Sequence, residues 1–300
     1  LGMKHFYLIK NPEKEGAEEV AEEISTYIKK YGGTCHIRRG NRVTLASQNS
    51  YTLDQKEQQR QFQYTNACEV PEDTECVITL GGDGTLIQAA RDLAGRRIPM
   101  VGVNLGHLGY LTQIGCREDV KELLDALVAD QYQLERRMML KGSIFHEGRF
   151  EKTDIALNEI VITRRETLRV LKFRIYVNGE YLSEYKADGM IAATPTGSTA
   201  YNLSAGGPIV EPNAQMTILT PICPHALNGR SIVLSAEDQI EIEALGNDDQ
   251  GQVAVFDGDT TIHMMVGDRI CIERSNIETI LVKLKHISFL DNLRNKLAGI

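Results

Sequence analysis

The sequence lacks any apolar run long enough to cross a membrane. A spanning helix needs roughly 18 or more consecutive apolar residues, and no stretch of the 300 residues approaches that length. The opening residues also show no signal-peptide pattern. We therefore expect a cytoplasmic protein, and the composition is typical of a globular chain.

Cysteines at short spacing are missing as well. The six cysteines are scattered along the chain, and no Cys-x-x-Cys occurs. This excludes the usual spacings of zinc sites and disulfide frameworks. Several of the cysteines fall in apolar, strand-like runs, which indicates reduced thiols, and no metal-ligating residue is predicted.

Positively charged residues are fewer than negatively charged ones. Lys and Arg number 33 against 41 Asp and Glu, which gives a formal net charge of −8. This charge argues against a general binder of nucleic acids or of anionic membranes. We expect small-molecule partners, with no nucleic acid and no membrane, and an anionic ligand would need basic groups gathered locally.

Two common phosphate-binding signatures are absent. No Gly-x-x-x-x-Gly-Lys-Ser/Thr occurs, and no Gly-x-Gly-x-x-Gly follows a strand. A kinase of the P-loop type is thereby excluded. The chain instead has Gly-Gly-Asp-Gly-Thr at 81–85, here called the glycine turn, between the apolar run Cys76–Leu80 and a helix-like stretch at 86–93.

The glycine turn predicts phosphate chemistry. A strand that ends in glycines and opens a helix presents bare backbone N–H groups and the positive helix end to an anion. Glycine permits close backbone approach and a positive φ. A carboxylate at Asp83, beside a phosphate, could hold a metal ion or accept a proton from an attacking hydroxyl. The alternative is an ordinary turn in which Asp83 is the N-cap of the helix.

The first part of the chain alternates strands and helices. Strand-like runs are expected at 4–9, 34–38, 76–80 and 98–103, and amphipathic helices at 13–31 and 117–130. This order predicts a Rossmann-like α/β domain with a parallel sheet over residues 1–136. The turn at 104–110 should then lie at the same sheet edge as Asp83. The polar segment 40–66 is predicted to be a mobile loop or insertion.

Residues 137–287 are predicted to form a predominantly β domain. Turn signals such as Asn178-Gly179 separate short β-like runs. These runs lie at 156–163, 170–177, 181–185, 190–194, 231–235, 239–244, 252–256, 269–273 and 278–285. A helix at 288–300 should pack back on the first domain, and the active site is expected in the cleft between the domains.

One segment, at 188–208, interrupts the β pattern. A short strand runs into Pro195, and Ser198 or Thr199 could cap a helical turn that continues to Ser204. The hydroxyl groups and free N–H groups of this segment suit a polar, hydroxyl-rich ligand. The alternative is a loop with a purely structural role.

Three motifs together resemble the NAD kinases, in the order and spacing of that family. They are the glycine turn, Asn158-Glu159, and the segment 188–208 with its Thr-Pro-Thr-Gly-Ser-Thr-Ala-Tyr core. The first is shared with diacylglycerol kinases, sphingosine kinases and phosphofructokinases, whereas the third is highly specific. The resemblance covers most of the chain from Glu75 onward.

This resemblance implies an enzyme that makes NADP⁺. The enzyme would transfer the γ-phosphoryl group of ATP, or of inorganic polyphosphate, to the adenosine-ribose 2′-hydroxyl of NAD⁺, with a divalent metal ion such as Mg²⁺. The family also forms homodimers and homotetramers. Asp188 matches a carboxylate that contacts the nicotinamide end, sometimes from a neighbouring subunit, so a homo-oligomer is expected.

The resemblance also implies roles for single residues. Asp83 would be the general base, with Gly84 shaping its turn beside the dinucleotide. Asn158 and Glu159 would hydrogen-bond ribose and base groups, and Tyr110 would pack against adenine. The dinucleotide loop is matched by Thr196, Thr199, Ala200, Tyr201 and Ser204. Lys186 and Arg169 match positions that are basic in some members, and Asp257 matches a turn that varies in the family.

Other interpretations stay open at this point. A lipid kinase would share the glycine turn and the two-domain plan, but it predicts an apolar groove and membrane-facing basic residues. A non-catalytic NAD(P) sensor would keep the dinucleotide loop, although retention of Asp83 argues against it. Asn158-Glu159 could be polar residues at a strand end, and Asp188-Gly189 could be a hairpin turn.

Overall fold

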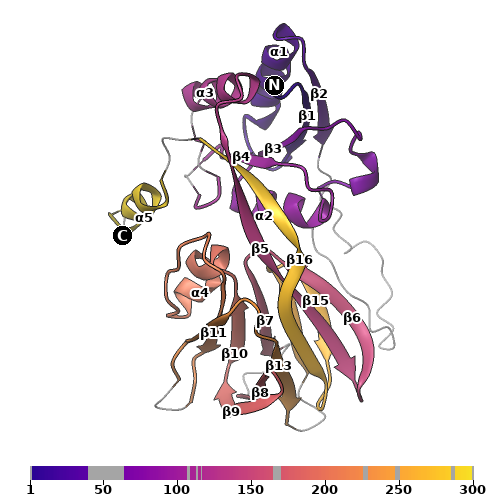
Figure 1. Ribbon diagram of the computed structural model, residues 1–300, viewed down its shortest axis with the longest axis vertical. Coiled ribbons are helices and arrows are strands. Elements are labelled where there is room, and N and C mark those ends of the chain that lie inside the picture. Colours follow the sequence, from indigo (N-terminus) through magenta and orange to yellow (C-terminus); the bar gives the residue numbers. More distant parts are fainter. Residues whose placement is uncertain are drawn as a thin grey trace. The chain divides into compact units, whose positions relative to one another are not determined.

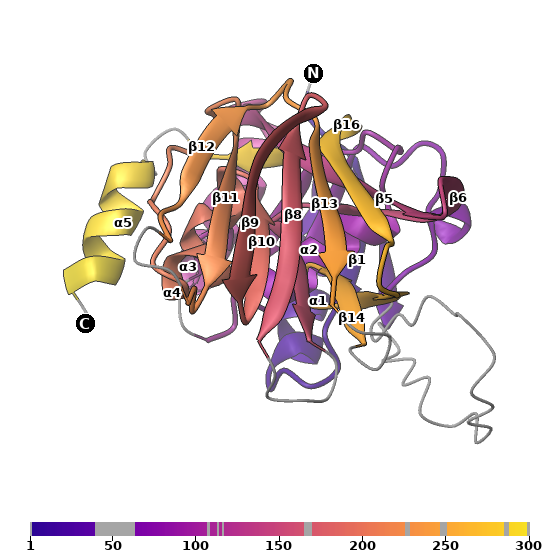
Figure 2. The same cartoon turned by 90° about the horizontal axis from the view of Figure 1, so that it is seen from below.

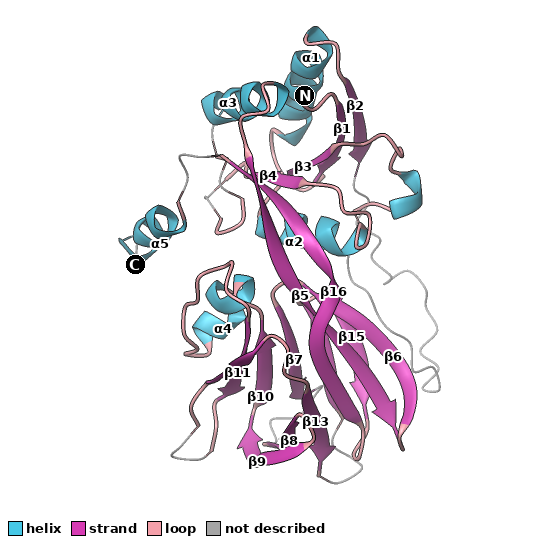
Figure 3. Ribbon diagram, in the orientation of Figure 1, coloured by secondary structure: helices cyan, strands magenta, loops and turns pink. Residues whose placement is uncertain are grey.

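The computed structural model describes residues 2–39, 64–106, 109–112, 114–115, 117–164, 170–225, 229–246, 251–284 and 288–298 (Figure 1). The predicted insertion lies outside the described residues over 40–63, and so does Arg169. The described chain forms two compact units, one with residues 2–39, 64–137 and 278–298 and one with residues 138–277. The first unit holds most of the helices and the second holds most of the strands (Figure 3).

The first unit is built on a parallel sheet. Its elements are β1 (His5–Lys10), α1 (Ala17–Lys30), β2 (Thr34–Arg39), a 3₁₀ turn (Ala67–Glu69), β3 (Cys76–Leu80), α2 (Asp83–Asp92), β4 (Met100–Val103), α3 (Arg117–Val128) and α5 (Phe289–Ala298). The strand order is β2-β1-β3-β4, with every pair parallel. Leu281, near the end of β16 (Arg269–Lys283), pairs in parallel with Met100 of β4. The predicted parallel α/β arrangement is confirmed.

Helix α1 is amphipathic and buries one face on this sheet. Val20, Ala21, Ile24 and Ile28 recur at spacings of three and four and are all buried. They share one core cluster with β1, β3, β4 and α3, whereas α2 packs against β3 and β4 (Figure 1). Because β1, β2, β3 and β4 are parallel, their carboxyl ends lie at one edge of the sheet. The loops after β3 and β4 line this edge.

The second unit contains two groups of strands. One is a six-stranded sheet of order β12-β11-β10-β7-β14-β15, and the other includes β9-β8-β13 with β16 and the β5-β6 pair (Figure 2). The bounds are β5 Gln133–His146, β6 Arg149–Ala156, β7 Glu159–Arg164, β8 Leu171–Val177, β9 Glu180–Ala187, β10 Gly189–Ala193, β11 Met216–Ile222, β12 Ile232–Ser235, β13 Ile240–Leu245, β14 Gln252–Phe256, β15 Thr260–Met264 and β16 Arg269–Lys283. β5 and β16 continue from one unit into the other. A predominantly β second domain is confirmed.

Strand β10 is buried on both faces, and this positions the segment that follows it. Met190 and Ala192 belong to the large core of the second unit, while Ile191 and Ala193 belong to a smaller cluster on the opposite face. Ala205 and Val210 pack on that smaller cluster. The hydroxyl-rich segment after β10 is therefore folded back over the sheet by its own apolar residues.

Four strands were not predicted: β5, β6, β11 and β15. The start of β5 carries several charged residues, which obscure the alternation of apolar and polar residues that a strand shows in the sequence. The partners of these charges are recognisable only in the folded structure. Glu135 accepts hydrogen bonds from Lys283 Nζ at 2.5 Å and from Arg137 at 2.6 Å. In β11, Pro221 argues against a strand, but it lies beyond the last β11–β12 pair, Leu219 with Ile232.

None of the helices formed by the described residues is long and apolar enough to span a membrane.

Candidate active site

The glycine turn begins helix α2, and Asp83 is its first residue. The N-cap is Gly82, in extended conformation with φ of −101°, and no side chain caps the helix. The alternative interpretation of Asp83 as N-cap is therefore wrong. A positive φ is not what requires glycine here, because none of Gly81, Gly82 and Gly84 has one. A Cβ at Gly81 would instead lie 2.2 Å from Thr85 Oγ1, whereas Gly82 and Gly84 face open space.

The Asp83 carboxylate binds the loop that follows β4. Oδ2 accepts from Tyr110 N at 2.8 Å, and Oδ1 accepts from Leu111 N at 3.2 Å and Thr112 N at 2.8 Å. The Thr112 hydroxyl adds a fourth hydrogen bond, to Oδ1, at 2.6 Å. The predicted proximity of Asp83 and the turn at 104–110 is confirmed, and the carboxylate holds the end of that turn.

Two further features of this loop were not predicted from the sequence. A Cβ at Gly109 would lie 1.9 Å from Asp83 Oδ1, so only glycine fits there. Lys296 of α5 lies over the Tyr110 ring, with Nζ 5.5 Å from the ring centroid. Tyr110, expected to pack against adenine, is thus held by its backbone to Asp83 and flanked by a cation.

In the second unit, Asp257 organises Asn158 and Glu159. Its Oδ2 accepts from Leu157 N at 2.7 Å, and its Oδ1 accepts from Asn158 N at 2.7 Å and Glu159 N at 3.1 Å. The Asp257 N–H donates to Glu159 O at 3.0 Å. Asn158 and Glu159 stand at the start of β7, as the strand-end interpretation expected, but their backbone is fixed by a carboxylate.

The side chains of this pair carry buried acceptor atoms. Asn158 Oδ1 and Glu159 Oε2 are buried and have no hydrogen-bond partner among the described residues. Burial and, to a smaller extent, the Asp257 charge together raise the pKa of Glu159 to about 8, against a hydrogen bond from the Tyr201 backbone that lowers it. Unpaired buried acceptors are costly, so this pair suits a ligand that brings hydrogen-bond donors.

The hydroxyl-rich segment is pinned against the same pair. The Thr194 hydroxyl donates to Leu157 O at 2.6 Å and accepts from Gly197 N at 3.0 Å. A Cβ at Gly197 would lie 2.1 Å from Asn158 O, so glycine is required for this approach. The structure therefore brings Asn158, Glu159, Asp257 and the segment 196–204 together within one unit.

Inside this segment, the predicted capping is wrong and a buried asparagine does the organising. The helical turn α4 (Tyr201–Ser204) follows a 3₁₀ turn (Thr196–Thr199), and neither is capped by a side chain. The Ser198 hydroxyl instead bonds Val210, accepting from its N–H at 3.0 Å. Asn202, fully buried, donates to Ser198 O and Pro208 O and accepts from the Thr220 hydroxyl at 2.7 Å.

The remaining predicted members of the loop differ in accessibility. The Thr199 hydroxyl donates to Thr196 O at 3.3 Å, and Thr196 itself is buried. Ala200 N donates to Gly197 O at 2.9 Å. Tyr201 is 44 % exposed, and Ser204 is exposed as well.

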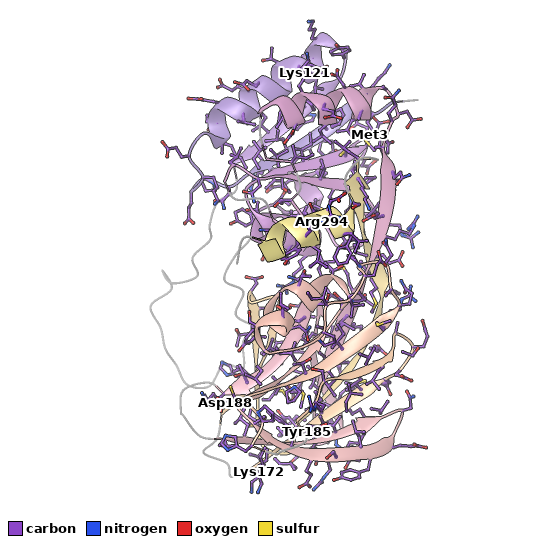
Figure 4. The ribbon with its side chains drawn as sticks, turned by 90° about the vertical axis from the view of Figure 1, so that its left-hand side faces the viewer. Met3, Lys121, Lys172, Tyr185, Asp188 and Arg294 are labelled. Carbon is purple, nitrogen blue, oxygen red and sulfur yellow. The ribbon has the colours of Figure 1, made fainter. Side chains whose placement is uncertain are left out.

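Asp188 and Lys186 lie apart from this group. Asp188 precedes β10, at the opposite end of the strand from the hydroxyl-rich segment, and five extended residues span roughly 17 Å. Its carboxylate forms two hydrogen bonds with Arg164, at 2.8 and 3.3 Å, and Figure 4 shows it at the same end of the unit as Lys172. Lys186 is exposed in β9, opposite Lys172.

Comparison with known proteins identifies the family. The model described as "ATP-NAD kinase N-terminal domain" matches residues 6–132, and that described as "ATP-NAD kinase C-terminal domain" matches residues 157–284. The chain belongs to the NAD kinase family. It is therefore an enzyme that phosphorylates NAD, and the lipid-kinase and sensor interpretations are set aside.

Individual NAD kinases are similar over nearly their whole length. The chain is 43% identical to the NAD kinase of Lachnospira eligens, over 98% of this chain and 100% of that one. It is 44% identical to the NAD kinase of Agathobacter rectalis, over 99% of each. Among solved structures, yeast NADH kinase complexed with NADH has a TM-score of 0.81 at 25% identity, covering 100% of this chain and 89% of that one. An NAD kinase from Archaeoglobus fulgidus in complex with ATP shares the fold, with a TM-score of 0.75 at 24% identity, over 99% of this chain and 100% of that one.

Proposed function

We propose that this NAD kinase uses ATP to phosphorylate the adenosine-ribose 2′-hydroxyl of NAD⁺, with Asp83 as the general base. The observation that carries the proposal is Asp83 itself, a part-exposed carboxylate at the start of α2 whose partners are all hydrogen-bond donors. A carboxylate held by donors stays oriented, which a proton acceptor needs. The relatives solved with NADH and with ATP support both substrates.

The reaction asks little covalent work of the protein. A ribose hydroxyl is a poor nucleophile near neutral pH, so a positioned base and an in-line, charge-neutralised γ-phosphoryl group supply most of the acceleration. Gly82 and Gly84 leave open space beside the first turn of α2. The positive end of that helix favours the negative charge of the phosphoryl group.

The second unit would hold the dinucleotide. Asn158 Oδ1 and Glu159 Oε2 supply buried acceptors for the donor groups of ribose or adenine. The adjacent loop adds the exposed Tyr201 ring and Ser204 hydroxyl, with Thr196, Thr199 and Ala200 shaping its turns. The predicted location of the whole site in an interdomain cleft, and the domain boundary near Arg136, stay predictions.

A divalent metal ion, Mg²⁺ in our proposal, would enter with the phosphoryl donor. Among the described residues, no group of three or more His, Cys, Asp or Glu side chains could hold a metal ion. Mg²⁺ commonly keeps several waters and binds through one or two carboxylates together with substrate phosphates. The donor set therefore fits an ion held mainly by ATP, which would neutralise charge at the γ-phosphoryl group, with Asp83 as the neighbouring carboxylate.

We further propose a cytoplasmic homodimer or homotetramer. Asp188 is separated from Asn158 by the length of β10, so a dinucleotide bound at Asn158 in one subunit could meet the Asp188 of another, with Lys186 and Arg169 offsetting its charge. Analytical ultracentrifugation of the active protein checks this. A single 33.4 kDa species that is fully active when dilute would contradict it.

The Asp83→Asn variant tests the general base. Asparagine cannot take up the ribose proton, so kcat should fall by about 10²–10⁴-fold while KM for NAD⁺ moves little. The substitution also has a structural effect. All four partners are donors, so one oxygen replaced by NH₂ must face either the Tyr110 N–H or the Leu111 and Thr112 donors. Thermal unfolding must therefore be measured alongside kcat.

Two outcomes would contradict the assignment. Near-wild-type turnover by Asp83→Asn would remove the general-base role. Recovery of the rate as Mg²⁺ is raised would show instead that Asp83 chiefly holds the metal. Asp92→Asn is a suitable control, since Asp92 lies at the other end of α2 and accepts from Tyr64 N and Thr65 N. It should lose stability without the loss of kcat.

A further inference from the structure

Thr112 is a completely buried threonine whose backbone N–H and side-chain hydroxyl both face Asp83. Its hydroxyl and its N–H lie 2.6 and 2.8 Å from Asp83 Oδ1, and Leu111 N adds a third donor to that oxygen at 3.2 Å. Asp83 Oδ2 accepts one hydrogen bond only among the described residues, from Tyr110 N. The two oxygens of one carboxylate are therefore unequally occupied.

The hydrogen of the Thr112 hydroxyl has one available direction. Asn104 Nδ2 donates to Thr112 Oγ1 at 3.2 Å, so the hydroxyl acts as acceptor toward Asn104 and its single hydrogen is left for Asp83. Asn104 is itself buried and fixed, because its Oδ1 accepts from Gly106 N at 3.0 Å. A short relay thus runs from Asn104 through Thr112 to Asp83 Oδ1.

Bare backbone on two sides keeps Thr112 in this orientation. A Cβ at Gly102 of β4 would lie 2.3 Å from the Thr112 methyl carbon. A Cβ at Gly109 would lie 2.4 Å from the Thr112 hydroxyl oxygen. The methyl group fills the space over one glycine and the hydroxyl fills the space over the other, so packing fixes the rotamer as well as hydrogen bonding.

We propose that Thr112 is the positioning residue of the general base, fixing Asp83 Oδ1 so that Oδ2 receives the proton of the ribose hydroxyl. This inference rests on the proposed role of Asp83. As the ribose O–H bond breaks, its proton passes to Oδ2 and its electron pair forms the bond from the ribose oxygen to the γ-phosphorus. The bond between the γ-phosphorus and the bridging oxygen breaks, and ADP leaves with that electron pair.

The asymmetry decides which oxygen reacts. A carboxylate oxygen offers about two lone-pair sites, so Oδ1, with three donors, has no site left for a substrate hydroxyl. Oδ2, with one donor, has room for a second. Without the Thr112 hydroxyl the carboxylate could turn about its Cβ–Cγ bond, and misplacement of a base by about 1 Å is enough to cost a large part of the rate.

A comparison of Thr112→Val with Thr112→Ser tests the proposal. Valine keeps the shape and removes the hydroxyl, so kcat should fall about 10-fold or more, with KM for NAD⁺ and for ATP within about twofold. Serine keeps the hydroxyl and removes the methyl, so it should retain most of kcat while lowering the melting temperature. The value of kcat should therefore depend on the hydroxyl, and the melting temperature should depend on the methyl group. A threonine with a merely structural role would not separate the two effects.

Thr79→Val is the matched control. Thr79 is fully buried in β3 of the same sheet, and its hydroxyl donates to Val101 O at 3.5 Å without touching Asp83. This variant should keep the wild-type kcat. Wild-type kcat in folded Thr112→Val, or equal losses in the valine and serine variants, would overturn the proposal.

A second variant covers the case in which Thr112→Val does not fold. Asn104→Asp leaves Thr112 in place but replaces the amide donor with an acceptor, which draws the hydroxyl hydrogen away from Asp83. Its kcat should fall about as far as that of the valine variant, and an unchanged kcat would count against the relay.

If Asp83→Asn itself turns over normally, the base assignment fails and the inference with it. If Asp83→Asn is inactive while folded Thr112→Val is normal, only the inference fails.

Discussion

Asp83 and Asp257 do the same structural work in two different units. Each carboxylate accepts hydrogen bonds from three consecutive backbone N–H groups of a distant segment: residues 110–112 for Asp83 and residues 157–159 for Asp257. In both cases the segment so held carries predicted substrate contacts, Tyr110 in one and Asn158 with Glu159 in the other. An acceptor-only side chain is well suited to gather consecutive N–H groups.

The neighbours of the two carboxylates differ, and this difference separates their roles. The fourth donor to Asp83 is the Thr112 hydroxyl, and none of its hydrogen-bond partners among the described residues is a carboxylate. Asp257 lies beside a second carboxyl group, that of Glu159, and its charge helps to raise the Glu159 pKa to about 8. The Asp83 carboxylate is surrounded by hydrogen-bond donors, whereas the second site favours a neutral acid, Glu159, next to a charged one.

The substitution Asp257→Asn gives the largest expected effect on stability, because it sets an NH₂ group against at least one of three backbone N–H groups. We expect the free energy of unfolding to fall by about 2–4 kcal/mol, since buried donors are left unpaired. NAD⁺ binding should weaken because Asn158 and Glu159 lose their support. Denaturant unfolding and NAD⁺ titration measure the two effects.

The same variant can break the comparison with Asp83. The kcat of enzyme saturated with NAD⁺ should change far less in Asp257→Asn than in Asp83→Asn, because Asp257 is not assigned a proton. A loss of kcat as large as that of Asp83→Asn, with unchanged NAD⁺ affinity, would show that the two carboxylates do not divide their work in this way.

The sequence predicted secondary-structure elements well where the pattern depends on neighbouring residues. The strand Cys76–Leu80 has the bounds that its continuous apolar run predicted, and the glycine turn was recognised together with its carboxylate. The last helix, expected at 288–300, is found as Phe289–Ala298. Each of these patterns depends on neighbouring residues only.

What the sequence did not show is the partner of each polar group. Thr112 binds a carboxylate 29 positions earlier, and Asn202 binds a hydroxyl 18 positions later. Asp257 was predicted only from a turn that varies in the family, yet its carboxylate fixes the backbone of Asn158 and Glu159, about 100 positions earlier. Such pairings follow from the sheet topology, which brings β7 beside β14. A threonine or asparagine within a turn gives no local sign of them.

The smaller expected effect concerns the protonation of Glu159. Its pKa is about 8 in the folded protein and near the ordinary value of about 4.3 in the unfolded chain. Between these values the folded state holds a proton that the unfolded state has lost, so the free energy of unfolding falls as pH rises through this window. The contribution is fully present below about pH 4.3 and is lost above about pH 8.

Glu159→Gln should therefore reduce the fall in stability between pH 5 and pH 9. Glutamine copies the neutral acid, so we expect this variant to be more stable than the wild type at pH 9, by roughly 1–2 kcal/mol, and similar to it at pH 5. Denaturant unfolding at the two pH values measures this. Glu180→Gln, at an exposed position of β9, is the control and should leave the pH dependence unchanged.

The NAD⁺ affinity of Glu159 variants also tests whether this side chain is protonated. A protonated Glu159 can donate one hydrogen bond and accept others, which glutamine also does, so Glu159→Gln should bind NAD⁺ at pH 7 far better than Glu159→Ala. If the glutamine and alanine variants bind equally poorly, the ligand requires a charged carboxylate at this position. Binding of the dinucleotide would then have to expel the proton from Glu159, whose pKa of about 8 favours the neutral acid at pH 7.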